Sequence, residues 1–172
     1  MRAFIQKAIE LNEIGVATAI AIGYDTSQRL GDILRATWTK YDGSSIRFNQ
    51  SKTSAKVICP LRQNTIDLIN SQTRTSVTIV TDHHGKPFTN NVAFNRSFRA
   101  VRRALGITRD LTFRDLRRTA ATEIMAGGGR SEPLTGHAPG SRVLKVYEVP
   151  NLAGAKNAQA VRQEITEIED EE

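Results

Sequence analysis

The 172-residue sequence has a single cysteine, Cys59, and it lacks any long apolar run. One cysteine excludes an internal disulfide and a zinc site built from several cysteines. No apolar stretch approaches the roughly 20 residues that a helix needs to cross a bilayer. The opening segment, MRAFIQKAIELNE, is too polar for a signal peptide. These absences predict a cytoplasmic protein with no membrane span.

Nucleotide-binding motifs are missing as well. The chain contains neither GxGxxG nor GxxxxGK[ST], and strands and helices do not alternate regularly along it. Internal repeats and low-complexity linkers are also absent, so the length suggests one domain with an ordinary core. A content of 39% hydrophobic and 24% charged residues is typical of a folded globular protein.

Acidic residues are scarce over most of the chain. All 24 Lys and Arg residues lie within residues 1–163 together with 12 acids, so this body carries a net charge of +12. The other six acids lie in residues 164–172, which hold no base and are expected to form a solubilising tail. An excess of Arg on a folded body is typical of a protein that binds nucleic acid. A surface of solvated arginines is the alternative.

The hydrophobic pattern predicts a mainly α-helical protein with a small antiparallel β-sheet, an α+β fold. Two helices are expected within residues 2–23, and a third follows a cap at Thr26 or Ser27. Residues 45–50 and 56–60 predict a β-hairpin. The other expected elements are a short strand at 77–80 and helices at 62–71, 90–105, 113–126, 141–149 and 154–168.

Arginine is concentrated in residues 95–119, which hold eight arginines and two acids. Within the expected helix at 113–126, Arg114, Arg117 and Arg118 have the spacing of one helical face. The planar guanidinium grips two phosphate oxygens at once, so this face predicts a phosphate clamp. An exposed basic face with ordinary ion pairs is the alternative.

Five segments, in order, resemble the tyrosine recombinases, or phage-type integrases. GYDTSQRLGDILRATW resembles the segment with that family's first arginine, and QSKTSAKV resembles the hairpin with its lysine. FRDLRRT, LTGH and VLKVYEVP resemble the family's H-x-L-R-[HR]-T pattern, its Gly-His pair and its tyrosine helix. The resemblance covers roughly residues 20–150 and implies the tyrosine recombinase catalytic-domain fold.

Arginines matching the family's clamp would bind the scissile phosphate. The resemblance implies that Arg29 and Arg117 hold its non-bridging oxygens and stabilise the charge of the transition state. Arg114 stands where the family usually has His, and a guanidinium can donate to phosphate but cannot accept a proton. Asp32, one turn after Arg29, is expected to pair with Arg29 and orient it.

The remaining catalytic roles fall on a lysine, a histidine and a tyrosine. The resemblance implies that Lys52, at the expected hairpin tip, protonates the 5′-oxygen leaving group, with Lys56 as the alternative. Tyr147 matches the nucleophile, whose phenolate the neighbouring cations would favour. His137 matches the histidine that hydrogen-bonds a phosphate oxygen or the phenol. Neither a metal nor another cofactor is implied.

The implied function is site-specific recombination by an integrase of a prophage or mobile element, through a 3′-phosphotyrosyl intermediate. DNA relaxation of the type IB topoisomerase kind and non-catalytic DNA binding are the alternatives. The expected partner is double-stranded DNA at attachment or recombination sites. Its backbone would also be contacted by Arg96, Arg99, Arg102, Arg103 and Arg118.

The resemblance also implies a domain organisation. Residues 1–153 would form the catalytic domain, and residues 154–172 would form a C-terminal helix and acidic tail. The N-terminal core-binding domain of full-length family members has no counterpart in this sequence. A homotetramer on DNA is expected for the full-length protein, whereas this fragment alone could be a monomer. The interval before the Gly-His pair is about three residues shorter than in the family, and the helix that leads into it looks clipped. Either the loop there is short, or residues are missing between Gly127 and Leu134.

Overall fold

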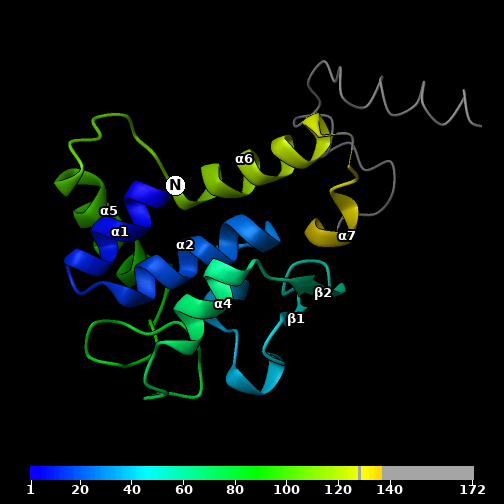
Figure 1. Cartoon of the computed structure of the whole chain (residues 1–172), viewed down its shortest axis with the longest axis horizontal. Helices are drawn as coiled ribbons and strands as arrows, with labels where there is room; N and C mark the ends of the chain where they lie inside the picture. The colour runs from blue at the N-terminus through cyan, green and yellow to red at the C-terminus, as the bar shows by residue number, and fades with distance from the viewer. Residues whose placement is uncertain (128, 137–172) are drawn as a thin grey trace, which may run out of the picture.

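The computed structural model describes residues 1–127 and 129–136 of the chain. The described part is mainly helical with a two-stranded antiparallel sheet, which confirms the predicted class (Figure 1). The helices expected at 141–149 and 154–168 lie outside it. In chain order the elements are α1 (Arg2–Glu10), α2 (Ile14–Thr26), α3 (Leu30–Leu34), the 3-10 helix η1 (Trp38–Lys40), β1 (Ser45–Asn49), β2 (Lys56–Pro60), α4 (Gln63–Asn70), α5 (Asn91–Ala104), α6 (Phe113–Ala126) and α7 (Glu132–Thr135).

Helix α2 is the centre of the fold. Its sequence, IGVATAIAIGYDT, is apolar on almost every side, and most of its residues are buried. Helices α1, α3, α4, α5 and α6 and strand β2 all pack against it. In Figure 1, α6 passes above α2 and α4 lies below it. None of the described helices, α2 included, has the length and apolarity of a membrane span.

Phenylalanine rings fix α1, α5 and α6 against α2. Phe4 of α1 stacks on Phe98 of α5 with the ring centroids 4.8 Å apart. Phe94 of α5 meets Phe113 of α6 edge-on at 5.6 Å. A Cβ at Gly23 of α2 would lie 2.5 Å from the Phe113 ring, so only glycine lets the start of α6 approach α2 this closely. The path of α6 is therefore set at its first turn.

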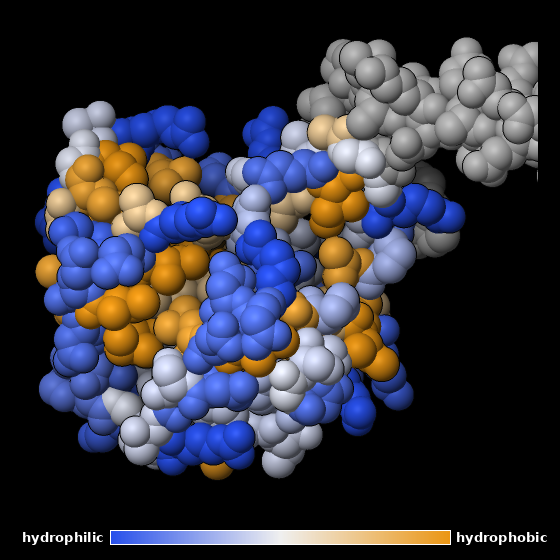
Figure 2. Space-filling model, in the orientation of Figure 1, coloured by the Kyte–Doolittle hydropathy of each residue, from blue (hydrophilic) through white to orange (hydrophobic). Residues whose placement is uncertain are grey.

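On the side of the molecule where α1 and α5 lie, this core reaches the surface. Figure 2 shows orange hydrophobic residues interspersed with blue hydrophilic ones there. Ile9 of α1 and Val92 of α5 are among the large apolar side chains that remain exposed. Isolated apolar residues of this kind are normal on a protein surface.

The predicted β-hairpin is confirmed. β1 and β2 pair antiparallel with Ile46 opposite Cys59 and Phe48 opposite Val57. Ile46, Phe48 and Cys59 are buried against the core. The loop at 50–55 joins the two strands at the end of the sheet.

The predicted cap of α3 is wrong. Thr26 ends α2, where its hydroxyl donates to the Ile22 carbonyl at 2.7 Å. Ser27 is the left-handed C-cap of the same helix, with φ 52°. Both residues terminate α2 instead of starting the next helix, and Arg29 is the N-cap of α3. Ser and Thr serve either end of a helix through local hydrogen bonds, so their presence alone does not say which.

Residues 77–80 enter the core without forming a regular strand, so that prediction is also wrong. Ile79 and Val80 are buried. The segment makes only an isolated antiparallel bridge, between Thr37 and Thr78. β-Branched residues fit any extended buried segment, so their pattern indicated burial and not sheet pairing.

Candidate active site

A cleft of about 730 Å³ opens between the start of α3, the hairpin loop, α5 and α6. Four basic side chains from three segments line it: Arg29, Lys52, Arg114 and Arg117. Its other lining residues are uncharged: Gln28, Leu30, Gly31, Asn91, Asn95, Thr112 and Phe113. The lining formed by the described residues thus contains four cations and no carboxylate. Such a concave surface of one charge sign attracts anions.

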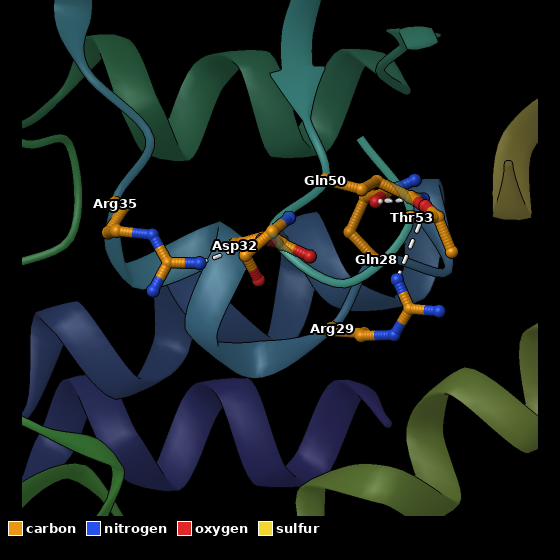
Figure 3. Close-up of polar contacts among 7 residues, drawn as sticks. Gln28, Arg29, Asp32, Arg35, Gln50 and Thr53 are labelled. Atoms are coloured by element: carbon orange, nitrogen blue, oxygen red, sulfur yellow. Dashed lines mark hydrogen bonds and ion pairs between the residues drawn. The ribbon is translucent and has the colours of Figure 1, made fainter. Parts of the chain in front are cut away.

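Arg29 is positioned by a neutral partner. As the N-cap of α3 it has an extended backbone, with φ −71° and ψ 144°. Its Nη1 donates to Oε1 of Gln50 at 3.1 Å (Figure 3). An amide oxygen orients a guanidinium and leaves its positive charge in place, because the amide carries no charge of its own.

Arg117 lies on the buried face of α6. It shares that face with Phe113, Ala120 and Ala121, and only 8% of the residue is exposed. Its Nη2 donates to the backbone carbonyl of Thr135 at 3.3 Å. A guanidinium so deeply placed needs hydrogen-bonding partners to offset its desolvation.

The basic face predicted for α6 is divided: Arg114 and Arg117 both line the cleft, whereas Arg118 does not. Arg117 is buried, whereas Arg114 and Arg118 are exposed. Arg117 comes four residues after Phe113 and four before Ala121, so it belongs to the stripe that packs against the core. Arg114 and Arg118 each follow one residue after that stripe, and of these two only Arg114 lines the cleft.

Asp32 does not orient Arg29, contrary to the prediction. Its carboxylate, 1% exposed, accepts from Arg35 Nη2 at 2.8 Å and from the Ser51 backbone N–H at 3.0 Å (Figure 3). Arg29 and Arg35 are both three residues away, but the extended backbone at the N-cap directs Arg29 toward Gln50 instead. Asp32 therefore anchors the hairpin loop to α3.

Lys52 lies in that loop, and its side chain is exposed. The bond from the preceding Ser51 N–H to Asp32 holds the base of the loop against α3. Lys52 lines the cleft, whereas Lys56 begins β2 and is not among the lining residues. The geometry thus supports Lys52 over Lys56 as the lysine that serves the cleft.

A short helix, α7, precedes the Gly-His pair. This single turn ends at Gly136, which has a left-handed backbone with φ 67°. His137, the next residue, and Tyr147 lie outside the described part of the chain, so their roles stay predictions.

The arginines of α5 differ in exposure. Three are exposed, as a backbone-binding surface requires: Arg96, Arg99 and Arg103. The side chain of Arg102 is only 15% exposed and donates to the Asp110 carboxylate and, at 3.1 Å, to the Leu111 carbonyl. It fastens the loop between α5 and α6, so it is less available than the other three, and its contact with DNA stays a prediction.

Asp115 stabilises the start of α6 beside the cleft. Its carboxylate accepts from the backbone N–H and the hydroxyl of Thr112, at 2.8 and 2.9 Å. The backbone bond is the main cause that lowers the pKa of Asp115, and the charges of Arg109 and Arg118 lower it further. The helix start that carries Arg114 is thereby held in place.

The donors available at the cleft are guanidinium, ammonium and amide groups. These groups bind phosphate oxygens directly, and charged donors bind them most strongly. Within residues 1–127 and 129–136, no group of three His, Cys, Asp or Glu side chains is placed to hold a metal ion.

Two residues of the site escaped the sequence analysis, namely Gln28 and Gln50. Gln28 directly precedes Arg29, and Gln50 stands two residues before Lys52. Closeness to matched residues was the available signal, but an uncharged amide in a polar segment has the pattern of a solvated surface residue.

Residues 2–150 match the phage integrase family. This chain belongs to that family. A curated relative, the integrase of Escherichia phage HK022, is 30% identical over an alignment of 130 residues that covers 68% of this chain and 36% of the relative. The chain therefore spans about a third of the length of that integrase.

Solved structures of integrases share the fold. A XerA recombinase matches with a TM-score of 0.71 and 17% identity, over 94% of this chain and 62% of that one. A lambda integrase dimer bound to a COC′ core site has a TM-score of 0.68 and 22% identity, over 84% and 45%. The lambda integrase catalytic core has a TM-score of 0.66 and 21% identity, over 81% and 89%. The predicted tyrosine recombinase catalytic-domain fold is confirmed.

Proposed function

We propose that this chain is the catalytic domain of a site-specific DNA recombinase, an integrase that cuts and rejoins strands through a 3′-phosphotyrosyl intermediate. The observation that carries the proposal is the cleft where Arg29, Lys52, Arg114 and Arg117 converge, with no carboxylate among the lining residues that the structure describes. Double-stranded DNA is the proposed partner, because its backbone presents phosphodiesters to such a cleft. Membership of the phage integrase family supports the same function.

The proposed reaction conserves the phosphodiester bond energy in a tyrosyl linkage. The phenol oxygen of Tyr147 attacks phosphorus, and the bond from phosphorus to the 5′-oxygen breaks. Arg29 and Arg117 stabilise the charge that builds on the non-bridging oxygens. Lys52 gives a proton to the departing 5′-oxygen. The 5′-hydroxyl of a partner strand then attacks the same phosphorus and releases Tyr147, so no ATP is consumed.

Arg114 changes the proton chemistry relative to most of the family. A guanidinium keeps its charge at every pH at which the protein is folded, so it can donate to phosphate but cannot act as a base. Its exposed position at the mouth of the cleft suits a contact with a phosphate oxygen. The proton of Tyr147 then passes to another acceptor, and His137 is the group proposed for this role.

The assay uses a duplex that carries the attachment site of the element, with a nick close to the cleavage point. Cleavage releases the short strand between the cleavage point and the nick, which carries the new 5′-hydroxyl and diffuses away. The covalent complex therefore accumulates and survives detergent. The wild-type chain is expected to form this adduct and the Tyr147→Phe variant is expected not to form it. An adduct in Tyr147→Phe would refute the nucleophile. DNA binding without an adduct at any pH would refute the reaction and leave a non-catalytic DNA-binding protein.

The lysine assignment has a matched control within the same hairpin. Lys52→Ala is expected to slow cleavage by about 100-fold or more, whereas Lys56→Ala leaves the rate unchanged. A substrate with sulfur in place of the bridging 5′-oxygen needs no proton on its leaving group, so it restores the rate of Lys52→Ala. A rescue of Lys56→Ala alone would move the role to Lys56.

Products separate recombination from topoisomerase chemistry. Exchange of partner strands yields recombinant DNA, whereas relaxation of a plasmid without recombinants indicates a type IB topoisomerase. A lambda integrase tetramer bound to a Holliday junction has the same fold, with a TM-score of 0.67 and 21% identity. We propose that this chain also acts as part of a tetramer on DNA, in the cytoplasm where chromosomal and phage DNA meet.

A further inference from the structure

Two buried glutamines lie behind the cleft. Gln28 is 0% exposed and Gln50 is 2% exposed, although glutamine is mostly a surface residue. Gln50 Nε2 donates to Gln28 Oε1 at 2.8 Å and to the Thr135 carbonyl at 2.7 Å. Gln28 Nε2 donates to the Leu134 carbonyl. The pair joins the segment that ends in Arg29, the end of the first hairpin strand and helix α7.

The amide of Gln50 has every hydrogen-bonding position filled. Its Oε1 accepts from Arg29 Nη1 at 3.1 Å and from Thr53 Oγ1 at 2.6 Å (Figure 3). Its Nε2 uses both hydrogens, on Gln28 and Thr135. The orientation of the amide is fixed, because a flip would point its NH₂ group at the Arg29 cation.

Gly136 lies directly against this amide. A Cβ at Gly136 would lie 2.7 Å from Gln50 Nε2 and 2.8 Å from Gln50 Cδ, and the residue has φ +67°. The Thr135 carbonyl, which accepts from Gln50, also accepts from Arg117 Nη2 at 3.3 Å. One side chain therefore touches Arg29, the partner of Arg117 and the glycine of the Gly-His pair.

We propose that Gln50 is a positioning residue, which holds Arg29 and the end of α7 in one geometry around the scissile phosphate. The inference rests on the proposed function and deepens it. Because the amide is neutral, it orients Arg29 while leaving the full cationic charge for the phosphate. Thr53, bonded to the same oxygen, extends this control to the loop that carries Lys52.

The inference is tested with Gln50→Leu, which keeps the bulk and removes all four hydrogen bonds. Adduct formation is expected to slow by about 10- to 100-fold, as misplacement of a catalytic group does. In an Arg29→Ala background the same substitution is expected to cost clearly less than in wild type, because the part of its effect that acts through Arg29 is already lost. An equal loss in both backgrounds overturns the proposal. Gln63→Leu on α4 is the control, since it is the same change at an exposed glutamine.

A second variant and a second measurement guard against a fold defect. Gln50→Asn keeps an amide but withdraws it by one methylene, and it is expected to show the same non-additivity with Arg29→Ala. Urea unfolding of each variant separates lost stability from lost rate. A variant as fast as wild type, with the fold intact, overturns the proposal.

The measurement on the guanidinium itself does not require cleavage. The ¹⁵Nε–Hε signal of Arg29, assigned by its loss in Arg29→Ala, is expected to shift in Gln50→Leu while the Arg62 signal stays in place. An unmoved Arg29 signal overturns the positioning role. The two proposals can fail separately. Absence of a Tyr147-dependent adduct in wild type refutes the function alone, whereas normal cleavage by folded Gln50→Leu refutes the inference alone.

Discussion

The cleft and the junction of α2 with α4 hold their arginines in different ways. At the cleft, Arg29 donates to an amide oxygen and Arg117 donates to a backbone carbonyl. At the α2–α4 junction, Arg62 Nε and Nη2 both lie 2.6 Å from Oδ1 of Asp25. A neutral acceptor leaves the charge of the guanidinium available, whereas a carboxylate cancels it. The partner thus distinguishes Arg29, whose charge stays available for a phosphate, from arginines such as Arg62 that hold the fold.

Two arginines paired with carboxylates fasten one part of the chain to another, namely Arg62 with Asp25 and Arg102 with Asp110. A third, Arg35 with Asp32, forms its pair within α3 and its C-cap. The Arg62 guanidinium also lies 4.6 Å above the Tyr24 ring, and its backbone N–H donates to Asp25 at the start of α4. These contacts serve packing, and none of the three arginines lines the cleft.

The difference between the two kinds of arginine is tested most strongly by neutralising one of each. Arg29→Gln is expected to slow adduct formation by about 100- to 1000-fold, the loss typical of one removed transition-state donor. Arg62→Gln is expected to leave the rate within about 3-fold, since interactions at distant sites are independent. Quench assays on one nicked duplex give both rates. A comparable loss in the two variants would show that the partner of an arginine does not indicate its role.

Gly136→Ala tests how strictly the neutral network at the cleft is packed. Its Cβ would meet the Gln50 amide, and φ +67° adds about 1–2 kcal/mol of backbone strain. Gly106→Ala is a matched control, because Gly106 has the same φ with nothing within 4 Å of its Cβ position. We expect urea unfolding to show the larger loss for Gly136→Ala, by about 1–3 kcal/mol of overpacking. Equal losses of unfolding free energy in the two variants would mean that the Gln50 side chain moves aside without cost.

The reactivity of the Cys59 thiol shows whether the strain in Gly136→Ala displaces α7. The thiol lies under α7 with Sγ 3.9 Å from the Leu134 carbonyl, and burial raises its pKa to about 11. Alkylation of the native protein is therefore slow. Displacement of α7 exposes the thiol, so Gly136→Ala is expected to be alkylated faster than Gly106→Ala.

Arg62→Gln is also expected to lower the stability of the fold. Its partner Asp25 has a side chain 1% exposed, so the carboxylate loses donors that water does not replace. The free energy of unfolding is expected to fall by about 1–2 kcal/mol. Arg35→Gln is expected to cost less, because Arg35 gives Asp32 one nitrogen, whereas Arg62 gives Asp25 two and also lies over the Tyr24 ring. A larger loss for Arg35→Gln would contradict the assignment of Asp25 as the tighter anchor.

Asp115→Asn, in the first turn of α6, has the smallest expected effect. The pKa of Asp115 is lowered in the folded state, so its contribution is present above its unfolded pKa of about 3.9 and is lost as pH falls. The variant is expected to lose less stability than wild type between pH 5 and pH 3. At neutral pH it should cost about 0.5–1 kcal/mol through the weakened cap. Identical acid dependence of urea unfolding in the two proteins would contradict this account.

Local patterns were sufficient to predict most of the elements. The helices α1, α2, α4, α5 and α6 and the hairpin follow from apolar periodicity and turn residues, which act within a few positions. The resemblance matched Arg29, Lys52 and Arg117, and the structure brings all three to one cleft. Spacing could not decide which carboxylate meets which arginine, because that depends on the packing of distant segments.

For some residues the sequence indicated the position in a helix or loop but not the partner. Arg102 follows the buried Phe98 by four residues, so its position beside the core stripe was readable, but its bonds to the next loop were not. Asp32 had arginines three residues away on both sides, and the backbone at the N-cap decided between them. Gln50 acquires its role only when α7 folds onto it, which no local pattern encodes.

The most direct test of the central claim is to identify the linkage in the covalent DNA complex. Protease digestion and mass spectrometry of the detergent-resistant adduct are expected to give a 3′-phosphate ester on Tyr147. The same linkage is expected from Arg62→Gln at a normal rate, and little of it from Arg29→Gln in the same time. A linkage on another residue, a 5′-phosphate ester, or full adduct yield from Arg29→Gln would contradict the account.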